Sequence, residues 1–364
     1  MSFTKKRPTF LRFVFTLFGG LIVSGGILML VQQFYQQYIK QSALRVPFFY
    51  LTGISTLLIA LFLVFPANKP YRLFKWLSRL VIMVLVVTLL WGIGGFYIAQ
   101  NHMIYMPGRR DMGAEAYLAE QTDIEEFQIN QDDKLTLNGY LWKTTPEKAG
   151  LILYFGGNGE LAAGRMMSLK QNQAEDFLAG YHVMMVDYPG YGKSGGEPTE
   201  ESIYQMAQLS YDYALSRKEV DGSKIVLIGW SLGSGSASML ASKNQIAGLV
   251  LMTPFYNGTE LLQNFVKDEL KADNMLTTIA GWLTRNKYPS DLYAKTASAN
   301  ARVLVLGGKK DTLIPYEQAE RLSTHFPNAE FVLLEGGHEA PWMEQQSLLA
   351  IKALLDAAAI PTTN

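Results

Sequence analysis

The chain of 364 residues contains no cysteine, and charged residues make up only 18% of it. The missing cysteine excludes disulfides, iron–sulfur clusters, cysteine-ligated zinc and a thiol nucleophile. The charged fraction lies below the roughly 25% that is usual in soluble domains. Net charge is zero, from 32 basic and 32 acidic side chains. This balance argues against a nucleic-acid-binding protein.

Acidic residues are absent from the first 110 positions, which carry 12 Lys and Arg side chains. The remaining residues carry 20 basic and 32 acidic side chains. Such a shift in composition predicts a boundary between two parts of different character. We therefore expect one domain over residues 1–110 and a second over residues 111–364.

Three uncharged apolar runs lie before this boundary, at about residues 13–31, 48–65 and 80–99. Each has roughly the 18–20 residues that a helix needs to cross a bilayer, and aromatic residues gather near their ends. The runs predict an all-helical anchor of three transmembrane helices that contacts membrane lipids. The alternative for the first run is a signal peptide with a basic start at Lys5. That run is long for a signal core, and no clear cleavage site follows it.

The orientation of the anchor is predicted from its short basic loops. The amino-terminal segment and the loop around residues 69–79 each carry four Lys or Arg, whereas the other two connections carry two each. By the positive-inside rule the amino terminus is cytoplasmic, so three spans place residues after 100 on the far side. This predicts a multi-pass protein of a bacterial inner membrane with a periplasmic domain. In the alternative, the weak run at 48–65 only dips into the surface and the domain is cytoplasmic.

The second part shows the pattern of an α/β domain. Segments 124–130 and 135–143 alternate apolar and polar residues about a short polar turn, which predicts a hairpin. Short apolar runs then alternate with helix-like stretches, as expected for buried parallel strands covered by helices on both faces. The runs are 151–155, 183–187, 225–229, 249–253, 303–307 and 331–334, and the helical stretches are 160–179, 199–217, 232–243, 315–325 and 342–358. We predict a mostly parallel sheet of about eight strands.

One connection, between Thr253 and Arg302, is longer than the others and contains two apolar helical stripes. Ligands of open α/β sheets bind beyond the carboxyl ends of the strands. The segment at about 258–300 is therefore a candidate helical lid over such a site. The alternative is that both stripes are ordinary core-packing faces.

A nucleophile motif of the type G-x-S-x-G follows one predicted strand and precedes a helix of small residues. It reads Gly229-Trp230-Ser231-Leu232-Gly233. A sharp strand-to-helix turn holds such a serine at the end of the sheet, and the flanking glycines leave room for that turn. We predict that Ser231 is a catalytic nucleophile.

A serine hydroxyl needs a base, and the base needs an acid that orients its ring. Of the four histidines, only His338 lies in a loop directly after a predicted strand, the last one. Asp311 follows the strand before it, which gives the order Ser, Asp, His. The rival acids are Asp187, which we expect to tie down its own loop, and Glu335, which lies too near the end of its strand.

The oxyanion formed during acyl transfer needs preorganised donors. We predict that these are the backbone N–H of Leu232, next to the nucleophile, and that of Asn158, in the glycine-rich turn after strand 151–155. Residues beside these turns are expected to contact the substrate, namely Gly157, Trp230 and Tyr256. A phosphate-binding role for the turn is disfavoured because no G-x-G-x-x-G pattern or P-loop lysine follows.

Residues 124–358 resemble an α/β hydrolase, and more narrowly the membrane-anchored ABHD-type branch and its bacterial relatives. The matching segments are 156–158, 187–194, the nucleophile motif, 253–255, 311–315 and 337–338. The chain departs from the family at Gly156, where a histidine that steadies the turn is usual. The resemblance implies hydrolysis of esters, thioesters or peptides and does not extend to the anchor.

We therefore expect a membrane-anchored serine hydrolase that cleaves lipid or other hydrophobic acyl esters through an acyl-enzyme, without a metal or cofactor. A serine peptidase using the same triad is the alternative, and an inactive membrane scaffold is a third. The sequence gives no indication of an oligomeric state.

Overall fold

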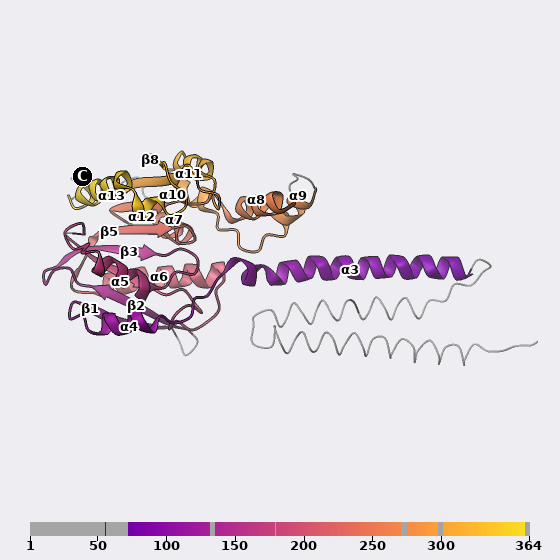
Figure 1. Cartoon of the computed structure of the whole chain (residues 1–364), viewed down its shortest axis with the longest axis horizontal. Helices are drawn as coiled ribbons and strands as arrows, with labels where there is room; N and C mark the ends of the chain where they lie inside the picture. The colour runs from indigo at the N-terminus through magenta and orange to yellow at the C-terminus, as the bar shows by residue number, and fades with distance from the viewer. Residues whose placement is uncertain are drawn as a thin grey trace, which may run out of the picture. The chain divides into compact units, whose positions relative to one another are not determined.

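The computed structural model describes residue 55 and residues 72–131, 135–178, 180–270, 275–297 and 301–360 (Figure 1). Its contacts divide the chain into two compact units, Met1–Gln100 and Asn101–Asn364. Tyr105 is buried in the core of the second unit. Residues 101–110 therefore contribute to the α/β domain, although the shift in charge places the boundary near residue 110.

In the first unit, the described chain forms the helix α3, Arg72–Ile104, which continues into the second unit. Within the described residues, Ser78–Ile98 is the one stretch that is long and apolar enough to cross a membrane. Its side chains Val81, Leu85 and Leu89 are exposed. A helix at the predicted run 80–99 is thus confirmed, whereas the runs 13–31 and 48–65 lie outside the described residues, apart from Ser55.

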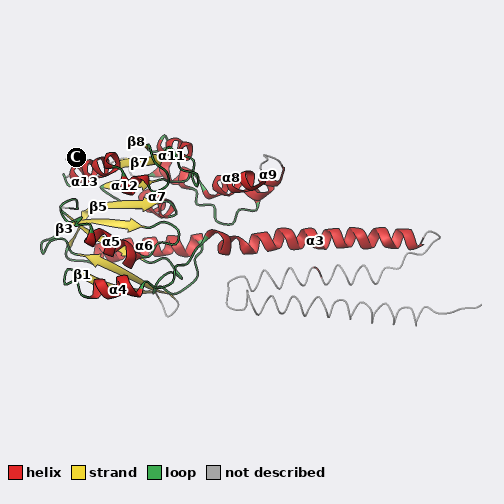
Figure 2. Ribbon diagram, viewed as in Figure 1, coloured by secondary structure: helices red, strands yellow, loops and turns green. Residues whose placement is uncertain are grey.

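The second unit is built on an eight-stranded sheet in the order β1-β2-β4-β3-β5-β6-β7-β8 (Figure 2). Strands β1 and β2 form the predicted antiparallel hairpin, β2 is antiparallel to β4, and the other pairs are parallel. The strands are Ile124–Gln131, Leu135–Trp142, Ala149–Phe155, Tyr181–Val186, Val220–Trp230, Gly248–Met252, Arg302–Gly308 and Ala329–Leu334. The predicted α/β fold with a mostly parallel sheet is confirmed.

Helices cover both faces of this sheet, because the central strands bury side chains on both sides. In β3, Leu151 and Leu153 join one core cluster, whereas Ile152 and Tyr154 join the other. The first cluster receives α6 (Glu200–Ser216), α7 (Gly233–Lys243), α10 (Ser290–Thr296) and α11 (Tyr316–Ser323). The second receives α4 (Met112–Ala119), α5 (Ala162–Gln171), α12 (Ala340–Met343) and α13 (Gln345–Ala358).

The segment proposed as a lid contains two helices, α8 (Gly258–Leu270) and α9 (Met275–Trp282), which pack on each other. Phe265, Met275 and Trp282 are exposed, so parts of both stripes face outward. Helix α10, which also falls within 258–300, instead packs against α7. A lid role for the segment 258–300 stays a prediction.

Helix α5 ends earlier than the predicted stretch 160–179. Its last residue is Gln171, and Asn172 caps it by donating from its side-chain amide to the Ser168 carbonyl. Gln173 then takes a φ of +53°, which turns the chain out of the helix. Leu178 still packs into the core, and this explains why the apolar pattern continues beyond the helix.

The position of the site follows from the strand order. The chain leaves β3 through α5 toward β4 on one side, and leaves β5 through α7 toward β6 on the other. Since α5 and α7 cover opposite faces, the connections diverge beyond the carboxyl ends of β3 and β5. Such a switch point leaves a crevice where ligands of α/β sheets bind.

Candidate active site

Ser231 lies directly after β5, in the turn that leads to α7. Its φ is +50°, a left-handed conformation that is uncommon for a residue with a side chain. The turn is held because the Ser231 N–H donates to the Met252 carbonyl and the Ser231 carbonyl accepts from Ser234. Strained conformations of this kind cost about 1–3 kcal/mol and persist where the surroundings enforce them. Ser231 thus has the backbone geometry expected of a nucleophile elbow.

The glycines of the motif are required by close backbone contacts. A Cβ at Gly233 would lie 2.1 Å from the Phe155 carbonyl oxygen, and one at Gly229 would lie 2.5 Å from the Gly233 carbonyl oxygen. The elbow therefore packs against the end of β3, beside the turn that follows it. Gly235, near the start of α7, makes room for the ring of Tyr288.

Asp311 and His338 are joined by a hydrogen bond of 2.7 Å between the His338 Nδ1 and the Asp311 Oδ2. The side chain of Asp311 is fully buried, and its other oxygen accepts from the N–H groups of Leu313 and Ile314 at 2.8 and 2.9 Å. These donors fix the carboxylate, which in turn fixes the imidazole. An Nδ1 proton donated to Asp311 leaves the His338 Nε2 as the acceptor.

The structure also brings His338 to the elbow. The ring of Trp230, the residue before the nucleophile, lies 5.8 Å from the His338 ring, and the Thr253 hydroxyl donates to the His338 carbonyl. Among the described residues, no hydrogen bond joins the Ser231 hydroxyl to His338. Such bonds are often long in the absence of substrate and tighten in the reacting complex.

The rival residues have other partners. Asp187 is buried and accepts the N–H of Ala162, the first residue of α5, so it caps that helix. Burial raises the pKa of Asp187 to about 6, although the N–H groups of Ala162 and Lys193 act to lower it. Glu335 is exposed and pairs with Lys309. His325 contacts the hydroxyl of Tyr256.

The predicted oxyanion donors lie on the two neighbouring turns after β3 and β5. Leu232 begins the turn into α7 with helical φ and ψ of −51° and −41°. Within the part of the chain that the structure describes, neither the Leu232 N–H nor the Asn158 N–H donates to another backbone group. Both N–H groups are therefore without a backbone acceptor, and their role as oxyanion donors stays a prediction.

The side chain of Asn158 makes structural hydrogen bonds, whereas its backbone N–H is the predicted oxyanion donor. Its Oδ1 accepts from the Met106 N–H and from the Tyr191 hydroxyl, both at 2.9 Å, and its Nδ2 donates to the Ile104 carbonyl. It thus ties the turn after β3 to the segment that follows α3. Tyr188 adds a further hydrogen bond of 2.6 Å to the Gly156 carbonyl.

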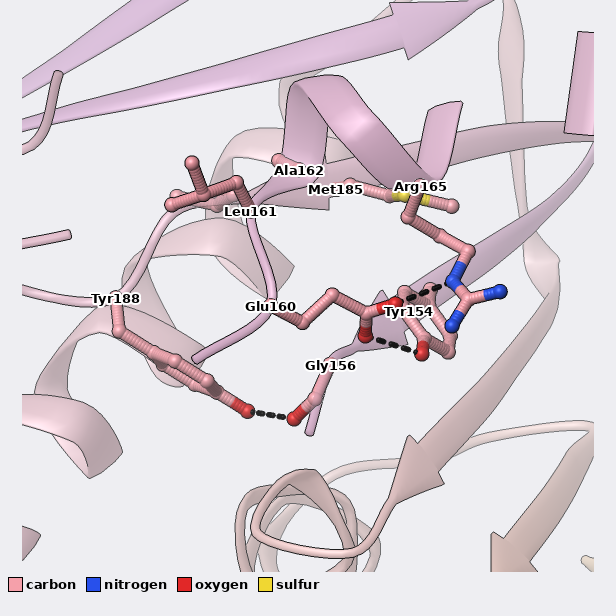
Figure 3. A pocket seen from close by; sticks show the side chains of 9 residues that line it. Tyr154, Gly156, Glu160, Leu161, Ala162, Arg165, Met185 and Tyr188 are labelled. Atoms are coloured by element: carbon pink, nitrogen blue, oxygen red, sulfur yellow. Dashed lines mark hydrogen bonds and ion pairs between the residues drawn. The ribbon is translucent and has the colours of Figure 1, made fainter. Parts of the chain in front are cut away.

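Glu160 and Arg165 also support this turn, and the sequence did not single them out. The Glu160 Oε2 accepts from the Gly157 N–H at 3.0 Å and from the Tyr154 hydroxyl at 2.6 Å, and its Oε1 pairs with Arg165. The group lines a cavity of about 10 Å³ beneath the turn (Figure 3). This volume holds about one water molecule, so it is not the substrate site.

Two of the three predicted substrate contacts pack on each other. A Cβ at Gly157 would lie 2.8 Å from the Trp230 ring, which places Trp230 under the turn. The Tyr256 hydroxyl lies 3.1 Å from the His325 Nε2, and the Arg321 guanidinium lies over its ring. Contact of any of them with a substrate stays a prediction. In the described ranges, no cluster of His, Asp and Glu forms a candidate metal site.

Known proteins share both the sequence pattern and the fold. Residues 151–288 match the family described as alpha/beta hydrolase fold, and residues 269–364 match one described as TAP-like protein. An uncharacterized protein of Mycobacterium tuberculosis is 29% identical over 276 residues, which cover 75% of this chain and 88% of that protein. Human ABHD12B is 30% identical over 182 residues, 47% of this chain and 48% of that protein.

Among solved structures, an esterase of Pyrococcus furiosus is similar to 70% of this chain and 98% of its own, with a TM-score of 0.56 and 16% identity. This likeness concerns the fold, which agrees with the strand order and the elbow described above. The motifs, the family match over residues 151–288 and the strand order agree that the chain has the α/β-hydrolase fold, and its sequence resembles the ABHD branch.

Proposed function

We propose that the protein is a membrane-anchored serine hydrolase that cleaves hydrophobic acyl esters. The observation that supports this most strongly is the Asp311–His338 hydrogen bond at the same edge of the sheet as the strained Ser231. A buried carboxylate that accepts from a histidine ring, which in turn faces a serine turn, is the arrangement that activates a hydroxyl nucleophile.

The reaction proceeds by acyl transfer to Ser231. The His338 Nε2 takes the proton of the hydroxyl as its oxygen attacks the ester carbonyl carbon, and the carbonyl oxygen becomes an oxyanion that accepts from the Leu232 and Asn158 N–H groups. Collapse breaks the bond to the leaving alkoxide, which receives the proton from His338. Water, deprotonated by His338, then releases the carboxylic acid and restores Ser231.

An ester substrate is favoured over an amide by two observations. The similar Pyrococcus furiosus protein is an esterase. The α8–α9 insertion, which follows β6, exposes apolar side chains that suit an acyl chain. A panel of p-nitrophenyl esters of rising chain length and of aminoacyl p-nitroanilides tests this. We expect turnover of esters, fastest for medium or long chains. Turnover of anilides alone would identify a peptidase, and turnover of neither substrate class would favour the scaffold.

The location is also part of the proposal. Ser78–Ile98 is apolar and exposes its side chains, as a membrane span does, and the basic loops favour a cytoplasmic amino terminus. With three spans the hydrolase domain is periplasmic. Fusions of alkaline phosphatase and of green fluorescent protein at the carboxyl terminus test it, since the phosphatase is active only after export. An inactive phosphatase fusion beside a fluorescent one would place the domain in the cytoplasm.

A further inference from the structure

The turn after β3 lacks a side chain at Gly156, and the carboxylate of Glu160 from the same loop fills this space. Gly156 has no side chain, and a Cβ built on it would lie 2.4 Å from the Glu160 Oε2. The same oxygen accepts from the N–H of Gly157, the residue next to the predicted donor Asn158. The carboxylate therefore binds the backbone of the turn at Gly157, the residue directly before Asn158.

The carboxylate is itself held on all sides. Tyr154, at the end of β3, donates to its Oε2 at 2.6 Å, and Arg165, from the first turns of α5, pairs with its Oε1 (Figure 3). The side chains of Glu160 and Arg165 are only 13% and 17% exposed. A charge-assisted pair that is partly withdrawn from water is stronger and more directional than an exposed one.

Aromatic contacts also connect the Glu160–Arg165 pair to His338, the proposed base. The Arg165 guanidinium carbon lies 4.0 Å from the ring centre of Trp342 and 5.4 Å from that of Trp230. Trp230 in turn faces His338 and packs beneath Gly157. Stacking on two aromatic rings fixes the orientation of the Arg165 guanidinium. The ion pair with Arg165 then fixes the Glu160 carboxylate beside the turn.

We propose that Glu160, held by Arg165, is a positioning residue for the oxyanion site: it fixes the turn Gly156–Gly159 so that the Asn158 N–H faces the developing oxyanion. This role rests on the proposed ester hydrolysis by Ser231. Glu160 itself does not touch the substrate. It acts only by fixing the position of the Asn158 N–H. A displacement of such a donor by about 1 Å can lower the rate about 100-fold.

The test compares a p-nitrophenyl ester with the corresponding thionoester. Sulfur is a weaker hydrogen-bond acceptor than oxygen and is larger, so a well-placed oxyanion site favours the oxygen ester. We expect Glu160→Ala to lower kcat for the oxygen ester about 10–100-fold, with KM little changed, and to lower the oxygen-to-sulfur ratio of kcat/KM. Partial unfolding would lower both rates equally and leave this ratio unchanged.

Two further variants test whether the defect comes from the lost hydrogen bonds of the Glu160 carboxylate. Glu160→Gln retains an oxygen that can accept from Gly157 and Tyr154, so it should restore most of the ratio. Gly156→Ala should displace the carboxylate and reproduce the Glu160→Ala defect, while adding little in the Glu160→Ala background, because coupled residues are not additive. Glu125→Ala is the control, since it removes ion pairs with Lys143 and Arg217 away from the turn.

If wild-type protein fails to hydrolyse the oxygen ester, the proposed function fails and the variants are not needed to show it. If wild-type protein is active and Glu160→Ala keeps the oxygen-to-sulfur ratio, the positioning role is wrong, whether or not overall activity falls. A lowered ratio that Glu160→Gln restores and Glu125→Ala leaves unchanged supports the proposal.

Discussion

The two sides of the site are built in different ways. On the base side, Asp311 receives hydrogen bonds from Leu313 and Ile314 of its own loop and passes its orientation to His338. On the oxyanion side, the turn 156–159 is held by groups outside it, some near in the sequence and some far from it. They are Tyr154, Arg165, Tyr188 and Tyr191, together with the backbone of residues 104–106.

On each side, the groups proposed to act on the substrate can be distinguished from the groups that hold them in place. The base side uses side chains for the proposed chemistry and backbone N–H groups of the Asp311 loop for support. Its residues can therefore be recognised from the local sequence. On the oxyanion side, the proposed donors are backbone N–H groups, and side chains such as Tyr154, Glu160 and Tyr188 support the turn. We therefore expect substitutions on the base side to remove the reaction outright, and substitutions on the oxyanion side to weaken it by degrees.

The largest effect is expected from the triad. Ser231→Ala or His338→Ala should lower kcat by about 10⁴–10⁶-fold with the fold intact, because the triad acts as a unit. Asp311→Asn should cost about 10⁴-fold through the wrong histidine tautomer. Initial rates of ester hydrolysis measure this, with His325→Ala as the matched histidine control. Near-normal activity of His338→Ala, with loss of activity in His325→Ala, would show that the base is misassigned.

A smaller effect is expected when one oxyanion donor is removed. Proline at position 232 lacks the N–H, and the φ of −51° found there suits its ring. Leu232→Pro should lower kcat about 10²–10³-fold, whereas Leu232→Ala keeps the donor and serves as the control. Circular dichroism and thermal unfolding would verify that the elbow region remains folded. Equal activities of the two variants would rule out the Leu232 N–H as a donor.

The side chain of Asn158 should affect stability more than the reaction. Asn158→Ala removes hydrogen bonds to Met106, Tyr191 and Ile104 but keeps the backbone N–H. Lost hydrogen bonds of this kind cost about 1–3 kcal/mol of unfolding free energy. Denaturant unfolding and kcat of the same preparation measure both effects. A loss of kcat as large as that of Leu232→Pro, with stability unchanged, would show that the side-chain amide itself stabilises charge.

The smallest effect concerns pH and Asp187, which caps α5 behind the oxyanion turn. Its pKa of about 6 in the folded protein lies above the ordinary value of 3.8, because burial disfavours the charged form. Between these values the folded state binds more protons than the unfolded state, so stability from this group falls as pH rises. The loss should amount to about 1–3 kcal/mol between pH 4 and 6.

Asp187→Asn should remove that dependence, because it cannot ionise. The difference in melting temperature between variant and wild type at pH 4.5 and at pH 6.5 isolates this group from the other carboxylates. We expect the melting temperature of the variant, relative to that of wild type, to be higher at pH 6.5 than at pH 4.5. A constant difference at both values would mean that Asp187 titrates normally in the fold.

The sequence predicted those parts of the molecule whose pattern is local. Alternating segments gave the hairpin, short apolar runs gave the buried strands, and the glycines around Ser231 indicated the elbow, since each depends on neighbours in the chain. The order of Asp311 and His338 after successive strands was enough to expect them at one edge. All these features are present in the structure.

The sequence did not reveal contacts that depend on the path of the folded backbone. Glu160 lies in a stretch predicted as part of a helix, and its bond to the Gly157 N–H is seen only once the turn is folded. The early end of α5 at Gln171 was hidden because Leu178 continues the apolar pattern. A glycine at position 156 was the one available signal that another side chain must support the turn.

The central claim is that His338 activates Ser231, and a fluorophosphonate probe tests it most directly. Membranes that contain the full chain are labelled, and the modified peptide is identified by mass spectrometry, with Ser231→Ala and His338→Ala in parallel. The account predicts a single adduct at Ser231 that is lost in Ser231→Ala and forms far more slowly in His338→Ala. An adduct at another residue, or labelling of Ser231 at an unchanged rate in His338→Ala, would contradict it.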